Sequence, residues 1–148
     1  MKPAVRNYSD NDIAVILRER GVTPTVQRVA ITREIFARCT HISAEEVFHI
    51  VNAGAGGAGR KVSKATVYNT LGLLAEKGVI RQVIADPTKV FYDPNTAPHH
   101  HFYDEETGEL TDINADQVKV MELPPLPQGK SLQGVDVIIR LRRSHAAH

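Results

Sequence analysis

Three consecutive histidines, His99, His100 and His101, form the densest group of metal-binding side chains in this 148-residue sequence. Alternate side chains of a β-strand share a face, so His99 and His101 can bind one ion while His100 points the other way. Asp93 lies six residues before His99, and Asp112 lies on the next predicted strand. Imidazole and carboxylate ligands together suit Zn²⁺, Mn²⁺ or Fe²⁺. The pattern predicts a metal site, although an exposed strand with a polar run would have the same sequence.

A His-x-His pair with two carboxylates also occurs in metallohydrolases and metal-dependent oxygenases. Such an enzyme needs a catalytic base and a substrate pocket besides its metal ligands. The sequence offers no separate group for either task, so we predict that the chain is not an enzyme.

The stretch from Ser63 to Gly78 carries chemistry of a different kind. Ser63 suits a helix N-cap, Gly78 suits the position just past a helix end, and the apolar residues at 67, 71 and 74 form one stripe. The remaining face holds small residues with Tyr68 and Asn69, where a merely solvated face would carry more charge. Both side chains can meet base edges in a DNA major groove. We predict a DNA-recognition helix, the alternative being a core helix with a thin polar face.

The elements around this helix would position it on DNA. Capping signals predict helices over about 9–20, 23–39 and 43–52, the second with Thr23 as N-cap and Pro24 as its first residue. Two β-rich runs, 79–85 and 89–92, follow the recognition helix and are joined by a turn. This order of elements is that of a winged helix-turn-helix domain.

Polar and cationic side chains of this domain are candidate contacts to DNA phosphates. Two of the arginines, Arg28 and Arg33, would equally suit a solvated helix face. The full candidate set, beside Tyr68 and Asn69 as base-reading residues, is Gln27, Arg28, Arg33, Arg60, Lys61, Lys64, Thr66, Arg81 and Lys89.

Charge divides the chain into two parts. Residues 1–92 carry 13 Lys and Arg against 8 Asp and Glu, whereas residues 93–148 carry 5 against 9. A basic part followed by an acidic part predicts a DNA-binding domain at 1–92, a hinge at 93–98 and a domain with another task at 99–148.

The second domain is predicted to hold strands at 99–103, 109–113 and 135–141, with a short helix over 114–122. Such a small domain buries little of its sheet alone, so we expect a homodimer. Two-fold symmetry would then present two recognition helices to a pseudo-palindromic operator in double-stranded DNA. The fold class is α+β.

Composition excludes several further classes of protein. A single cysteine, Cys39, leaves no intramolecular disulfide and no zinc site built on paired cysteines; we interpret it as a small buried apolar residue. No apolar run reaches the roughly 18 residues of a membrane helix, and no signal peptide opens the chain. We therefore expect a cytoplasmic protein.

Four runs, Gly21–Arg28, His41–Glu46, Ala65–Leu71 and His99–Phe102, resemble in the same order the ferric uptake regulator family. The resemblance implies a homodimeric transcriptional regulator with an N-terminal winged-helix domain, a C-terminal α+β dimerisation domain and a regulatory metal between them. The regulatory ligands it implies are His41, Asp93, His99, His101 and Asp112; His41 has no local pattern that singles it out. Asp at positions 93 and 112 looks closest to the peroxide-sensing branch.

The departures from the family pattern are also informative. Asp104 and Thr107 stand where members usually have a Cys-x-x-Cys pair for structural zinc, so no such zinc is expected. Lys119 and Val135 appear where a second metal site usually has Glu and His. Asn69 replaces an Arg that is common after Ala-Thr-Val-Tyr, and Thr23 replaces a usual Lys, which argues against the usual operator.

The His-His-His-Phe run without these cysteines is similar to the iron response regulators of rhizobia and related α-proteobacteria. That resemblance implies control of iron and haem metabolism genes, with haem relieving DNA binding and a haem-delivering protein as a further partner. Imidazole is a competent haem ligand, so the candidates are His99, His100 and His101. The alternative is a peroxide- or metal-responsive repressor that uses Fe or Mn at the five regulatory ligands.

Overall fold

A computed structural model describes residues 7–38, 41–53 and 61–144 of the chain. Two of the residues discussed above, Cys39 and Arg60, lie outside this described part. The chain divides into two compact units, Met1–Thr96 and Ala97–His148. Among the described helices, none has the length and apolar character to cross a membrane. The cytoplasmic location stays a prediction.

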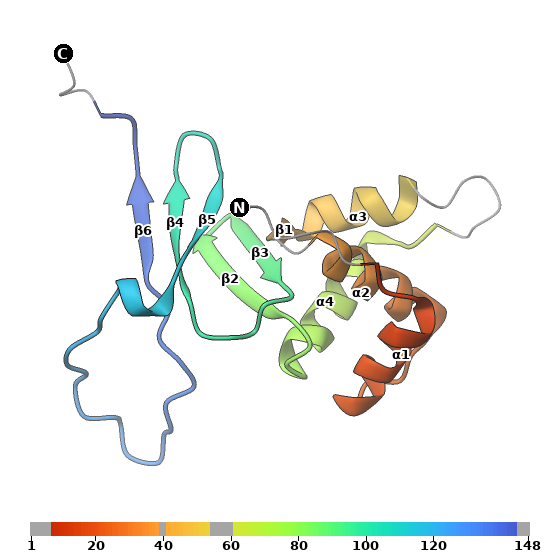
Figure 1. The fold of residues 1–148 in the computed structure, drawn as a ribbon, viewed down its shortest axis with the longest axis horizontal. Helices are drawn as coiled ribbons and strands as arrows, with labels where there is room; N and C mark the ends of the chain where they lie inside the picture. The colour runs from red at the N-terminus through yellow and green to blue at the C-terminus, as the bar shows by residue number, and fades with distance from the viewer. Residues whose placement is uncertain (1–6, 39–40, 54–60, 145–148) are drawn as a thin grey trace. The chain divides into compact units, whose positions relative to one another are not determined.

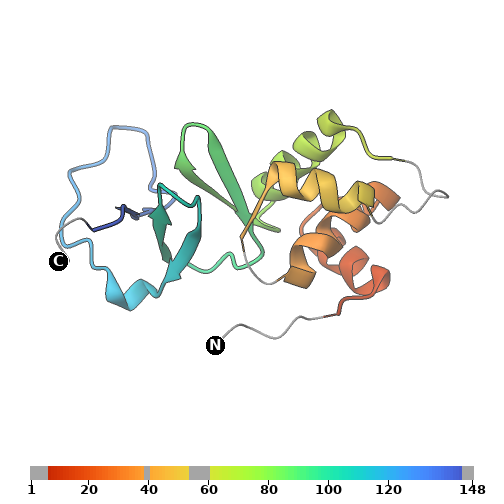
Figure 2. The same ribbon diagram turned by 90° about the horizontal axis from the view of Figure 1, so that it is seen from above.

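The first unit has the order of elements that its sequence predicts, with one additional strand. Its elements are α1 (Asp10–Glu19), α2 (Val26–Arg38), β1 (Ile42–Ser43), α3 (Ala44–Ala53), α4 (Lys64–Glu76), β2 (Arg81–Asp86) and β3 (Lys89–Asp93). The β2–β3 hairpin follows α4 and forms the wing of a winged helix-turn-helix fold (Figure 1 and Figure 2).

Side-chain caps start most of these helices where the sequence indicates. The Ser9 hydroxyl accepts the Asp12 N–H while the Asp12 carboxylate accepts the Ser9 N–H, which is the predicted capping box of α1. Ser63 caps α4 through its hydroxyl, which accepts the Thr66 N–H, without the reciprocal bond. Gly78 follows α4 with φ of 73°, a left-handed conformation that glycine adopts without strain.

The predicted start of α2 is wrong by two to three residues. The Thr25 hydroxyl accepts the Arg28 N–H at 3.2 Å, and the Thr25 carbonyl accepts the Val29 N–H. Thr25 therefore takes the capping position, and Pro24 lies before the helix instead of in its first turn. Either threonine satisfies the sequence rule, and only the fold distinguishes them.

The apolar stripe of α4 faces the core of the first unit. Val67, Leu71 and Leu74 have no exposed surface. They pack among residues of every helix and of the sheet, the whole cluster being Ile13, Leu17, Val22, Val29, Ile31, Ile35, Ile42, Ala44, Val47, Val62, Val67, Leu71, Leu74, Val79, Ile80 and Tyr92. This burial fixes which side of α4 remains outside: the side that holds Tyr68 and Asn69.

Strand β1 is the element of the first unit that the sequence does not predict. It pairs antiparallel with β3, Ile42 opposite Tyr92 and Ser43 opposite Phe91, in a sheet of order β1-β3-β2. Ser43 also accepts the Glu46 N–H and so starts α3. Two residues are too few to show a strand period, which is why the capping signal alone is visible in the sequence.

The second unit is a small sheet of order β5-β4-β6. Its strands are β4 (His100–Asp104), β5 (Leu110–Ile113) and β6 (Ile138–Leu141), with β5 antiparallel and β6 parallel to β4. The helix predicted over 114–122 is wrong: only a single 3₁₀ turn, η1 (Ala115–Gln117), forms there. No residue of η1 is buried, and a short helix without a packed face is unstable in water.

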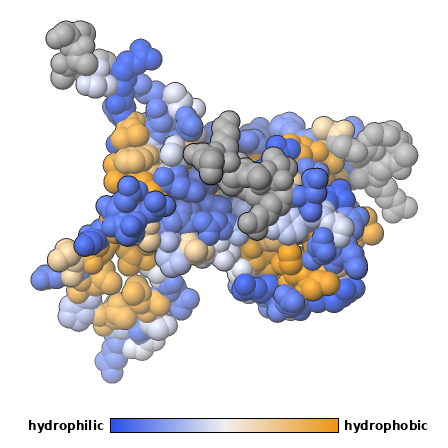
Figure 3. Space-filling view, in the orientation of Figure 1, coloured by the Kyte–Doolittle hydropathy of each residue, from blue (hydrophilic) through white to orange (hydrophobic). Residues whose placement is uncertain are grey.

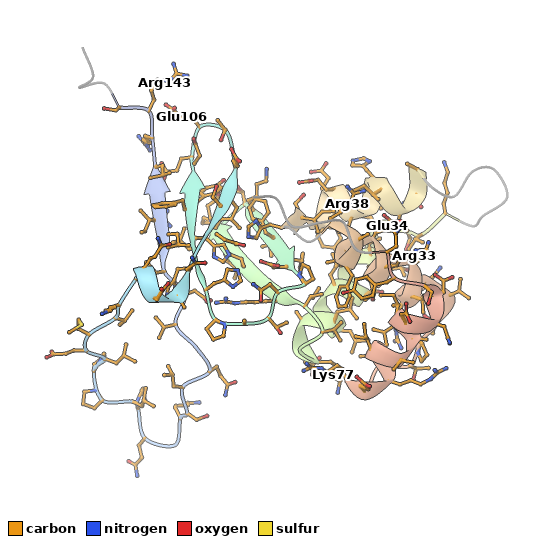
Figure 4. All side chains as sticks on the ribbon, viewed as in Figure 1. Arg33, Glu34, Arg38, Lys77, Glu106 and Arg143 are labelled. Carbon is orange, nitrogen blue, oxygen red and sulfur yellow. The ribbon has the colours of Figure 1, made fainter. Side chains whose placement is uncertain are left out.

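Charged side chains connect the β4–β5 turn to the residues that follow β6. The Thr107 and Glu106 N–H groups donate to Asp104 in the β4–β5 turn and hold the pKa of that carboxyl below its usual value. After β6, Arg142 pairs with Glu105 at 2.7 Å, and the Arg143 N–H donates to Glu106 (Figure 4). The turn thereby holds the end of β6 against β4.

An extended segment at 118–137 connects η1 to β6 and carries exposed apolar side chains. Val120, Met121, Leu123, Leu126 and Leu132 are all exposed. Figure 3 shows the corresponding orange patches at its lower left. Apolar groups gathered on one segment are more typical of an interaction surface than of a solvated loop.

Asn52 connects the end of α3 to the approach to α4. Its amide nitrogen donates to the carbonyls of Phe48 and Val62, and its side-chain oxygen accepts the Val62 N–H at 2.7 Å. We expect Asn52→Ala to lower the free energy of unfolding by about 2 kcal/mol, because it leaves part-buried backbone groups of Val62 unsatisfied. Urea denaturation measures this change. Asn11→Ala, at an exposed site in α1, is the control; equal stability of both variants would contradict the prediction.

Candidate functional site

Two histidines of the second unit converge on one carboxylate. In the β4–β5 ladder His101 lies opposite Asp112. The Nε2 atoms of His99 and His101 each lie 3.3 Å from Asp112 Oδ1, and their ring centroids are 4.5 Å apart. His99 and His101 are buried, whereas Asp112 is exposed. The structure thus brings together three of the predicted metal ligands.

Backbone contacts fix the tautomer of His99. Its Nδ1 lies 2.7 Å from the Ala97 carbonyl oxygen, which can only accept, so Nδ1 carries the proton. In the neutral ring, Nε2 then presents a lone pair toward the Asp112 carboxylate. A shared metal cation, or a second proton on the ring, would stabilise these two facing electron-rich atoms. An N–H held by a carbonyl is how metal-binding histidines are usually oriented. The donor set fits a divalent metal ion.

His100 lies on the opposite face of β4 and has a different environment. The Val137 N–H donates to His100 Nδ1 at 3.1 Å. A neutral His100 therefore carries its proton on Nε2 and has no lone pair there for iron. Of the three haem candidates, His100 can ligate only after this hydrogen bond or that proton is lost.

The first unit supplies a separate pair of donors. His41 Nε2 lies 3.4 Å from Asp93 Oδ2, while Asp93 Oδ1 accepts the Asn95 N–H at 2.8 Å. The pairing of Ile42 with Tyr92 places the two residues together, since His41 directly precedes β1 and Asp93 is the last residue of β3. The sequence predicts the pair only through the family resemblance, because β1 itself is not predicted.

The candidate base-reading residues lie on the outer side of α4. Tyr68 and Asn69 are exposed, as is Lys64 at the start of the helix. Thr66 is half-buried, and its hydroxyl accepts from the Ser63 hydroxyl at 2.9 Å. Lys61, just before the helix, is exposed as well.

The other candidate phosphate contacts make different interactions within the first unit. Arg33 is ion-paired with Asp10 of α1, which restrains its charge within the unit. Arg28 Nη1 donates to the Thr23 carbonyl at 3.1 Å. Lys89 Nζ lies 5.7 Å from the centre of the Phe91 ring, at the tip of the wing. Arg81 is half-buried at the start of β2.

A groove between the first turn of α2 and the outer side of α4 combines residues that the sequence places far apart. Thr25 and Gln27 lie on one wall and Asn69 on the other; the full lining is Thr25, Gln27, Arg28, Thr66, Asn69, Thr70 and Leu73. The sequence alone does not predict this groove, because no local pattern indicates the contact between α2 and α4.

Comparison with known proteins identifies relatives along most of the chain. A sequence model of the ferric uptake regulator family matches residues 19–134. The peroxide-responsive repressor PerR of Staphylococcus aureus is 29% identical over 106 residues, which cover 72% of this chain and 69% of the repressor.

Solved structures show the same fold. The ferric uptake regulator of Pseudomonas aeruginosa, solved with manganese, superposes with a TM-score of 0.65 at 23% identity, covering 88% of this chain and 97% of its own. A zinc uptake regulator in complex with zinc and DNA superposes with a TM-score of 0.56 at 18% identity, covering 93% and 91% of the two chains.

The convergence on Asp112 generates a prediction for metal affinity. We expect Asp112→Ala to weaken Mn²⁺ binding by at least about tenfold, because losing even an outer-shell partner costs about 10- to 100-fold. Isothermal titration calorimetry of the full chain measures this affinity. Asp116→Ala removes the same charge from the exposed η1 turn and should leave affinity unchanged. Equal affinities in the two variants would count against a metal ion at Asp112.

Proposed function

Since this chain belongs to the ferric uptake regulator family, we propose that it is a homodimeric repressor whose binding to operator DNA depends on a divalent metal ion at its His/Asp donors. Members of this family are metal-responsive transcriptional regulators, and the chain is accordingly not an enzyme.

The observation that carries this proposal is the convergence of His99 and His101 on Asp112 Oδ1 at 3.3 Å each. Neutral imidazole and carboxylate are ligands of Zn²⁺, Mn²⁺ and Fe²⁺ alike. A bound divalent ion would stabilise these electron-rich atoms by its positive charge and would hold the three side chains in one arrangement.

We further propose that one ion takes ligands from both units. The second unit offers three donors, and the pair of His41 and Asp93 in the first unit offers two. A closed metal site needs at least four protein ligands, which neither set supplies alone. The five donors together would suffice.

An ion shared in this way would regulate DNA binding by a population shift. Metal occupancy changes DNA affinity only if the DNA-binding arrangement of the protein holds the ion more tightly than other arrangements do. A tenfold effect on DNA affinity corresponds to a difference of about 1.4 kcal/mol.

DNA recognition is assigned to the outer side of α4. Tyr68 and Asn69 are available to base edges, and Lys61, Lys64, Thr66, Arg28 and Lys89 to phosphates. Arg33 would have to leave Asp10 to join them. Support comes from the zinc uptake regulator, which shares this fold and is solved with DNA. Exposed apolar side chains in 118–137 would contribute to the interface of the homodimer.

Haem and peroxide are two further candidates for the signal that controls DNA binding. Haem control is implied by the resemblance to iron response regulators, but the contacts of His100 with Val137 and of His99 and His101 with Asp112 favour a divalent ion. Peroxide sensing is favoured by the 29% identity to a peroxide-responsive repressor. With Fe²⁺ as the resident ion, peroxide would add one oxygen atom to a ligand histidine, which mass spectrometry detects.

Metal-dependent DNA binding tests the proposal directly. We expect Mn²⁺ to raise the affinity for a duplex selected from a random pool by at least about tenfold, measured by fluorescence anisotropy at fixed salt. Substituting both His99 and His101 with Ala should abolish this increase. His49→Ala, an exposed histidine on α3, is the matched control and should respond like the wild type.

Two outcomes would overturn the metal proposal. DNA affinity that is unchanged by Mn²⁺, Zn²⁺ or Fe²⁺ in the wild type would do so, as would an unchanged metal response in the double variant. Loss of DNA binding on addition of haem, with a histidine-type absorption spectrum, would instead support haem as the signal.

A further inference from the structure

The polar side chains that line the groove between α2 and α4 differ in their exposure and in their hydrogen-bond partners. Thr66, Asn69, Thr70 and Leu73 recur at helical spacing and so form one side of α4, with Thr70 buried at the floor and Asn69 exposed at the rim. Across from them, Gln27 is exposed in the first turn of α2. Two neutral amide side chains thus line one groove from different helices.

Three other polar side chains of the groove, those of Thr25, Arg28 and Thr66, already have partners within the unit. The Thr25 hydroxyl accepts the Arg28 N–H, Arg28 donates to the Thr23 carbonyl, and the Thr66 hydroxyl accepts from Ser63. Within residues 7–38, 41–53 and 61–144, the side chains of Gln27 and Asn69 make no hydrogen bond. Their donors and acceptors are available to an external ligand.

The chemistry of an amide identifies which base it would select. Each amide offers one donor and one acceptor side by side, which matches the N6 donor and N7 acceptor of adenine in the major groove. An arginine at the same position would instead match the two acceptors of guanine. Neither amide carries a charge, so contacts to phosphate are the less favourable use of these groups.

We propose that Asn69 and Gln27 are specificity-determining residues that each select an adenine in every half-site of the operator. This inference rests on the DNA binding proposed above and adds the base that is read. It assigns Gln27 to a base edge, where its sequence position suggested only a phosphate contact.

The test is selection of binding sites from a random duplex pool, followed by measured affinities for single-base variants of the selected site. We expect Asn69→Ala to reduce the preference for adenine at one position by about tenfold. Gln27→Ala should do the same at a second position. Asn69→Gln should retain adenine, whereas Asn69→Arg should shift the preference to guanine.

Salt dependence separates base contacts from phosphate contacts. Asn69→Ala and Gln27→Ala should leave the slope of log affinity against log salt unchanged, because no charge is lost. Lys64→Ala, on the same helix, should weaken binding to all sequences and reduce the slope by about one. Circular dichroism confirms that each variant is folded.

The outcomes distinguish this inference from the proposed function. If the wild type binds a selected site and Asn69→Ala or Gln27→Ala lowers affinity equally for all bases, or leaves the adenine preferences unchanged, the inference is overturned while DNA binding stands. If the metal-loaded wild type selects no site at all, the proposed function itself fails.

Discussion

The register between β4 and β5 determines which histidines can meet a carboxylate. Because side chains alternate between the faces of a sheet, pairing His101 with Asp112 places His99 on the same face and His100 on the other. A slip of one residue would place His100 beside the carboxylate and turn His101 away. Two neighbouring imidazoles in one short strand therefore have different chemistry: one faces an anionic oxygen, and the other accepts the Val137 N–H.

In the first unit, strand β1 likewise determines which histidine meets a carboxylate, although it has only two residues. Its pairing with β3 brings His41 and Asp93 together from positions far apart in the sequence. Ser43 belongs to this strand and also caps α3, so the donor pair and the start of a helix depend on the same short segment. The position of His41 and Asp93 is thus connected directly to the framework that supports α4.

Local signals in the sequence predict most of this architecture. The capping box of Ser9, the stripe of Val67, Leu71 and Leu74, and the hairpin after α4 each depend on near neighbours. Two features that escaped prediction depend on distant partners: the strand β1 and the groove that joins Gln27 to Asn69. The choice of Thr25 over Thr23 as the cap of α2 escaped prediction because both threonines satisfy the same local rule. The helix expected over 114–122 failed for a related reason, because helical propensity without a surface to pack on is insufficient.

The hydrogen bonds of Asn52 affect which insertions and deletions the connection between α3 and α4 can accommodate. Two of its hydrogen bonds hold Val62, two residues before the first residue of α4, and the third joins the same amide to the Phe48 carbonyl in α3. The approach to α4 is therefore tied to α3 by this amide group as well as by the packing of both helices in the core. Insertions or deletions in the Gly- and Ala-rich stretch that separates Asn52 from Val62 would change the length of the connection while leaving the start of α4 tied to α3.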